Sequence, residues 1–160
     1  MMPSHLKPPL DMDFLRQEYF RLQEAIDKFD EKAISIKAWS VTVSMAGIGT
    51  AFLKHAPGLL LLSGIASLLF WLIEAWWKAF QQAFYPRMYE IESLMMGHAV
   101  DHPTSPFIGG SWMLAWTKAR ERGQIWEILW WPHVFLPHAL VALVGVLGWI
   151  ANLRFHFVAP

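Results

Sequence analysis

The sequence contains no cysteine and few charged residues. Without cysteine the chain cannot form a disulfide, a thiolate metal site or a cysteine nucleophile. Charged residues make up 16% of the chain, against about 25% in ordinary soluble domains. The 13 basic residues balance the 13 acidic ones, so the chain has no net field that would attract a nucleic acid. These absences disfavour a disulfide scaffold and a nucleic-acid-binding protein.

Apolar and aromatic residues are abundant. Hydrophobic residues account for 55% of the 160 positions, with ten Trp and eleven Phe among them. A soluble domain of this size leaves about a third of its surface in water, so it cannot bury so much apolar area. The composition therefore predicts that the lipid bilayer is a partner of this chain.

Three stretches are apolar enough to cross a bilayer, which needs about 20 apolar residues as helix. Residues 134–153 contain no charged side chain, and residues 57–77 contain only Glu74. Residues 38–53 are shorter and need the preceding turn to complete a span. The tight connection at 54–58 predicts a helical hairpin. We expect an all-α integral membrane bundle of three transmembrane helices; the alternative is a soluble protein with buried helices.

The pattern divides the chain into six segments. We predict a flexible N-terminus (1–10), a cytoplasmic amphipathic helix (11–37), a transmembrane hairpin (38–78), a cytoplasmic and interfacial helical segment (79–131), a third transmembrane helix (132–153) and an external tail (154–160). Within 79–131, a loop at 101–111 precedes two short interfacial helices. We expect their aromatic residues and Leu129 to face lipid.

The basic residues indicate the orientation. Eleven lie before the first span or between the second and third, and only Lys54 and Arg154 lie on the other side. Because basic residues stay in the cytoplasm, we expect a multi-pass protein of the inner membrane with its N-terminus in and its C-terminus out.

Residues 11–36 carry an apolar seam in alternating steps of three and four, as in a coiled coil. No Gly or Pro occurs between Asp11 and Ala46, so one helix is expected to continue into the first span. Two interpretations remain open: the seam packs on the cytoplasmic segment of its own chain, or it forms a stalk between copies.

Small residues line each of the three spans. In lipid, small residues mark the faces on which helices pack closely. Three such faces exceed what one hairpin and one helix require, which favours a homo-oligomer. The contacts that we predict between copies are Leu15, Tyr19, Leu22, Ile26, Phe29, Gly47, Ala51, Gly145 and Gly148.

Four ionisable residues are expected at or near membrane depth: Glu74, Lys78, His133 and His138. An ionisable group in the membrane is a candidate for ion passage or protonation. The structural alternative is that Glu74 pairs with Lys78 one turn on. The two histidines are either a proton-responsive pair or polar residues at the interface, which we favour.

The nearest approach to a metal cluster is His98, Asp101 and His102. Pro103 follows at once and disfavours helical geometry there, so we expect no metal site. The sequence has no zinc-protease, phosphate-loop or nucleophile-elbow motif. We therefore expect no catalytic residue, no cofactor and no enzymatic activity; a membrane-bound metal enzyme is the remote alternative.

The segment from Glu18 to Glu92 combines an amphipathic helix with a two-span hairpin that ends in FWLIEAWWKAFQQAFYPRMYEIE. In this it resembles the RipA-like octameric bacterial membrane proteins and the SLATT-type membrane modules associated with anti-phage nucleotide signalling. The third span has no counterpart in that two-span plan. The resemblance implies self-assembly in the cytoplasmic membrane without enzymatic activity.

Together these features predict a self-associating protein that acts as an oligomeric assembly or pore-like element, in stress or phage defence. An accessory subunit of a larger membrane complex is the alternative.

Overall fold

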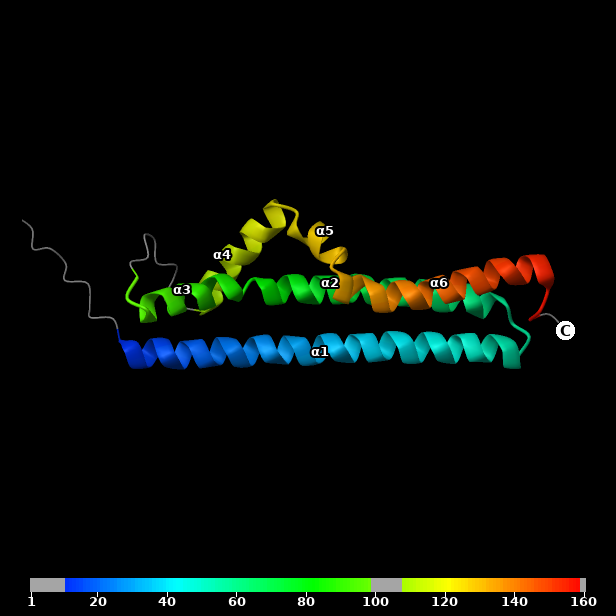
Figure 1. Ribbon diagram of the computed structural model, residues 1–160, viewed down its shortest axis with the longest axis horizontal. Coiled ribbons are helices and arrows are strands. Elements are labelled where there is room, and N and C mark those ends of the chain that lie inside the picture. The colour runs from blue at the N-terminus through cyan, green and yellow to red at the C-terminus, as the bar shows by residue number, and fades with distance from the viewer. Residues whose placement is uncertain (1–10, 99–107, 159–160) are drawn as a thin grey trace, which may run out of the picture.

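The computed structural model describes residues 11–98 and 108–158, and 88% of these are helical. The described residues form no strand, which confirms the predicted all-α class. The helices are α1 (Met12–Leu53), α2 (Gly58–Gln82), α3 (Tyr85–Met95), α4 (Ile108–Glu121), α5 (Gln124–Leu129) and α6 (Pro132–Phe155). Figure 1 shows α1 along the whole length of the molecule, with the other helices on one side of it.

Helix α1 is one unbroken helix of 42 residues, as predicted. Its N-cap is Asp11, whose carboxylate accepts hydrogen bonds from the backbone N–H groups of Asp13 and Phe14 at 3.0 and 3.1 Å. This cap satisfies donors that the first turn of a helix leaves without partners. At a rise of 1.5 Å per residue, α1 is about 63 Å long, much longer than a bilayer core is thick.

Three helices are long and apolar enough to cross a membrane: α1, α2 with its continuation α3, and α6. Their presence confirms the predicted architecture of a multi-pass membrane protein. The predicted hairpin is also confirmed, because α1 ends at Leu53 and α2 begins at Gly58. Helix α2 packs along both α1 and α6 and so forms the centre of the bundle.

Helices α2 and α6 approach each other closely at Gly145. A Cβ atom there would lie 2.7 Å from the carbonyl oxygen of Leu60 and 2.8 Å from the backbone nitrogen of Gly64. Real side chains do not tolerate such distances, so only glycine fits. Small residues thus bring these two helices close enough for backbone contact, as lipid-embedded helices require.

The residues that we predicted to join copies make contacts within one chain. Leu15, Leu22 and Ile26 are buried, and the first two pack with Ile91 of α3. Ala51 is also fully buried. The assignment of these residues and of Gly145 to contacts between copies is therefore wrong, because the chain's own helices cover them.

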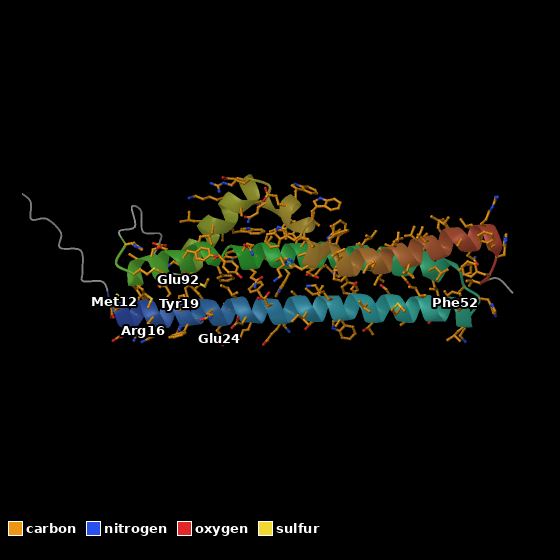
Figure 2. All side chains as sticks on the ribbon, viewed as in Figure 1. Met12, Arg16, Tyr19, Glu24, Phe52 and Glu92 are labelled. Carbon is orange, nitrogen blue, oxygen red and sulfur yellow. The ribbon has the colours of Figure 1, made fainter. Side chains whose placement is uncertain are left out.

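The other four residues of that set also have partners inside the chain. The Tyr19 hydroxyl donates to Glu92 at 3.1 Å, and Figure 2 shows both side chains between α1 and α3. Phe29 lies against Trp77, with ring centroids 4.7 Å apart. Gly47 faces Ser63, and Gly148 lies in van der Waals range of Leu60. Of the two interpretations of the seam, the structure supports packing on a later segment of the same chain, helix α3.

Helices α4 and α5 form an arch on the face of α2 away from α1 (Figure 1). Both predicted short helices are present, although α4 already begins at Ile108, inside the predicted loop. Trp112 and Trp116 pack on Phe80 of α2, and Leu129 is buried. Leu129 is therefore covered by the chain itself, and the prediction that it faces lipid is wrong. Trp112 and Trp116 are half-buried against α2, and Trp126 and Trp130 are exposed.

Candidate functional site: a polar cluster between the three spans

Five polar side chains meet where α1, α2 and α6 pack together. We call them the polar cluster: Lys37 and Ser40 from α1, Ser67 and Glu74 from α2, and His138 from α6. Ser67, Glu74 and His138 are 0% exposed and Ser40 is 1% exposed. Only the Lys37 side chain, at 26% exposure, reaches the surface.

The imidazole of His138 is the centre of the cluster. Its Nε2 lies 2.9 Å from Oε2 of Glu74, and its Nδ1 lies 2.8 Å from Oγ of Ser40. The Ser67 hydroxyl donates to the backbone carbonyl of His138 at 2.9 Å and lies 3.3 Å from Oγ of Ser40. The Lys37 ammonium forms an ion pair with Oε1 of Glu74. The cluster therefore connects all three spans.

Charge balance indicates how the protons are arranged. The Lys37 ammonium neutralises the Glu74 carboxylate, and a net charge buried away from water is costly. If His138 is neutral and donates from Nε2 to Glu74, the cluster has no net charge. Nδ1 of His138 then accepts a hydrogen bond from the Ser40 hydroxyl.

The same geometry accommodates one additional proton. In an imidazolium, both ring nitrogens donate, so Nδ1 of His138 would donate to Ser40. The Ser40 hydroxyl would turn to Ser67, which still donates to the His138 carbonyl. Every donor keeps an acceptor in this arrangement, because the two serine hydroxyls are rotors.

Ser40, His138 and Glu74 are connected in the order hydroxyl, imidazole and carboxylate. This order is that of a nucleophilic triad, which the spacing in the sequence did not indicate. A nucleophile must reach a substrate, however, and Ser40 is 1% exposed. The arrangement thus holds three helices together and, as it stands, gives no substrate access to the hydroxyl.

The predicted pairing of Glu74 with Lys78 is wrong. Glu74 pairs across the bundle with Lys37 and His138. The Lys78 ammonium instead contacts Asp30 of α1 and donates to Oε1 of Gln81 at 2.9 Å. The physical reason is that Glu74 faces the interior, where partners from other helices compete successfully with the neighbour one turn away.

The two histidines of α6 have different surroundings. His138 is fully buried, so its prediction as an interfacial residue is wrong; Glu74 and Ser40 compensate its burial. His133 is exposed, and its ring lies 5.5 Å from that of Trp131. One histidine therefore lies inside the bundle and the other on its surface.

Of the three weak candidates for metal ligands, the structure describes only His98. His98 is exposed after α3, whereas Asp101 and His102 lie outside the described residues. Within residues 11–98 and 108–158, no group of three or more His, Asp or Glu side chains is placed to hold a metal ion.

A second buried ionic contact fixes the N-terminal part of α1. The guanidinium of Arg87 donates from Nε and Nη2 to the two carboxylate oxygens of Glu18, at 2.9 and 2.8 Å. Glu90 lies 3.1 Å from Nη1. The hydrogen bonds that Arg87 donates to Glu18 raise the pKa of Arg87, although burial opposes the shift. This two-point contact between planar groups is strong and specific in orientation.

The sequence analysis did not identify Lys37, Ser40, Ser67, Glu18 or Arg87 as functional residues. One signal was present: a lone carboxylate in lipid needs a partner, and Lys37 opens the first span. No family model, curated protein or solved structure matches the chain. The resemblance to RipA-like and SLATT-type proteins accordingly stays a prediction.

Proposed function

We propose that this protein is a structural subunit of a membrane assembly, which associates with further copies of itself through the outward face of α1. The observation that carries this proposal is a row of small residues on an otherwise bulky surface. The row consists of Ser35, Ala38, Thr42, Ala46 and Gly49, all of them exposed.

These five residues recur at steps of three and four, so they share one face of α1. A Cβ atom added at Gly49 would meet nothing within 4 Å, which means that no helix of the chain covers this face. The outward faces of the other two spans carry large side chains at the same depth: Leu62, Ile65, Leu69, Leu72, Leu136, Leu140, Leu143, Val144, Leu147 and Ile150.

The difference between these surfaces has an energetic meaning. Lipid tails are as apolar as leucine, so bulky faces gain little by leaving lipid, whereas small residues allow two backbones to approach closely. An uncovered small-residue face therefore favours contact with another helix. The polar cluster supports this role, because it fixes α1, α2 and α6 as one unit with the small-residue face outward.

We favour an assembly element over a pore or an enzyme. The ionic groups at the depth of the polar cluster point into the chain, so they do not line a channel between copies. The excess of basic residues on one side supports an inner-membrane location with the N-terminus in the cytoplasm.

The test compares Ala46→Leu with the control Val43→Leu, which enlarges an exposed residue on the same helix outside the row. Both variants should keep the fold, because neither touches a buried position. We expect the unaltered protein to form a particle larger than one chain in neutral detergent. Ala46→Leu should weaken this association at least about tenfold, a loss of about 1.4 kcal/mol, because the larger side chain keeps the two backbones apart. Energy transfer between labelled copies in vesicles provides a second measurement.

A monomeric mass for the unaltered protein in detergent, with no energy transfer in vesicles, would contradict self-association. The accessory-subunit alternative would then remain, in which the same face of α1 contacts a different membrane protein.

A further inference from the structure

A pocket of about 480 Å³ lies between α4 and the junction of α2 with α3. This volume falls within the range of about 300–1,000 Å³ that is typical of small-molecule sites. The pocket is separate from the polar cluster and from the small-residue face of α1. Its polar lining includes Gln82, Tyr85, Tyr89, Lys118, Arg122 and Gln124.

The positive charge of this pocket is not balanced by the described residues that line it. Lys118 and Arg122 form no ion pair with any described residue, and no described residue that lines the pocket is acidic. The third cation of the lining, Arg87, is engaged by Glu18 and Glu90. The surplus positive charge therefore comes from Lys118 and Arg122.

Lys118 and Arg122 are four residues apart. Two like charges at this spacing destabilise a helix, although the C-terminal end of α4 attracts cations. The helix end explains the presence of basic residues but not their position beside a pocket with amide and phenol groups. An anion between the two side chains would remove the repulsion and gain charge-assisted hydrogen bonds.

The pocket lies beside an aromatic cluster of α2 and α4. Trp112 and Trp116 stack at 5.9 Å, and both contact Phe80. Aromatic groups of this kind are enriched where the membrane meets water, and basic pockets on the cytoplasmic side of helices bind lipid head groups. Both a lipid head group and a soluble phosphate compound could therefore reach this site.

We propose that the pocket between α4 and the α2–α3 junction binds a phosphate group, held by Lys118 and Arg122. The phosphate belongs to an anionic phospholipid or to a small soluble phosphate ester. Gln82 and Gln124 offer amide N–H donors, and Tyr85 and Tyr89 provide an aromatic wall with ring centroids 6.1 Å apart.

The experiment measures the thermal shift and native mass of the full chain in neutral detergent. Phosphatidylglycerol, phosphatidylcholine and glycerol phosphate are the probes. The variant Arg122→Gln is compared with Arg120→Gln, which removes the same charge from the end of the same helix but does not line the pocket. Both positions are exposed, so both variants should fold.

We expect Arg122→Gln to weaken binding of an anionic probe about five- to tenfold, and Arg120→Gln to weaken it less than twofold. Binding of phosphatidylglycerol alone identifies a lipid head group; binding of glycerol phosphate as well identifies a soluble ester. Equal losses in the two variants would overturn the proposal, because they would indicate general attraction to surface charge. Failure of both anionic probes to bind, or equal binding of phosphatidylcholine, would overturn it too.

Discussion

The contact between His138 and Glu74 provides a direct test of how the three spans are aligned. We consider His138→Leu, which replaces the imidazole by an apolar side chain of similar length. The substitution eliminates the contacts of Nε2 with Glu74 and of Nδ1 with Ser40. Lys37 still neutralises Glu74 in this variant, so no buried charge is left without a partner.

The ion pair between Lys37 and Glu74 that remains in this variant limits the loss of free energy of unfolding. Removing one partner of a buried ion pair costs about 3–5 kcal/mol, whereas single hydrogen bonds in a membrane protein average about 0.6 and reach about 1.7 kcal/mol. Because the ion pair survives and two hydrogen bonds are lost, we expect the free energy of unfolding to fall by about 1–3 kcal/mol. The measurement is unfolding of the purified protein in mixed detergent micelles, followed by circular dichroism.

A double-mutant cycle separates the contact from general effects on packing. Glu74→Met combined with His138→Leu should show a coupling of about 1 kcal/mol, and Glu74→Met combined with Lys78→Met should be additive within about 0.5 kcal/mol. The second pair is the matched control, because its members are one helical turn apart but do not pair. Strong coupling of Glu74 to Lys78 with none to His138 would refute the alignment.

Further predictions concern the other contacts between helices. Gly145→Ala should destabilise the bundle by about 1–3 kcal/mol through overpacking, whereas Gly148→Ala should change stability by less than about 0.5 kcal/mol, in the same unfolding assay. Arg87→Lys loses the two-point contact with Glu18, so hydrogen exchange in the first half of α1 should increase at least about tenfold; unchanged exchange would contradict the contact. The pKa of Arg87 is raised above its ordinary value, chiefly by the hydrogen bonds that it donates to Glu18. Its contribution to stability is therefore fully present below its ordinary pKa and is lost only as the pH rises through the folded value. The difference in amide protection between the unaltered protein and Arg87→Lys, corrected for the base catalysis of exchange, should therefore persist up to about pH 10. Reporter fusions should place the two chain ends on opposite sides of the membrane; the same side for both would exclude three spans.

The sequence was sufficient to predict the elements because their signals are local. The length of each apolar stretch and the absence of Gly and Pro between Asp11 and Ala46 depend only on neighbouring residues. The same holds for the hairpin connection and for the two short helices of the arch. Each of these predictions was confirmed, with differences of a few residues at the ends.

The sequence was not sufficient to predict which partner each polar or small residue has. Glu74 has a favourable neighbour in Lys78 by spacing, but the alignment of α1 and α6 against α2 brings Lys37 and His138 closer. That alignment depends on contacts such as the one at Gly145, between residues far apart in the chain. A small residue likewise shows that a helix packs closely, but it does not show whether the second helix belongs to the same chain.

The continuity of α1 has a mechanical consequence. Its ionic contacts with Glu74, Lys78 and Arg87 lie between Glu18 and Lys37, and the helix has no proline at which it could bend. A rotation of the spans within the bilayer therefore moves the N-terminal end of α1 along with them. With the first span starting at residue 38, as the sequence predicts, about 37 Å of α1 would lie outside the lipid at 1.5 Å per residue. Tilting the bundle by about 10° would then displace the start of α1 sideways by about 6 Å.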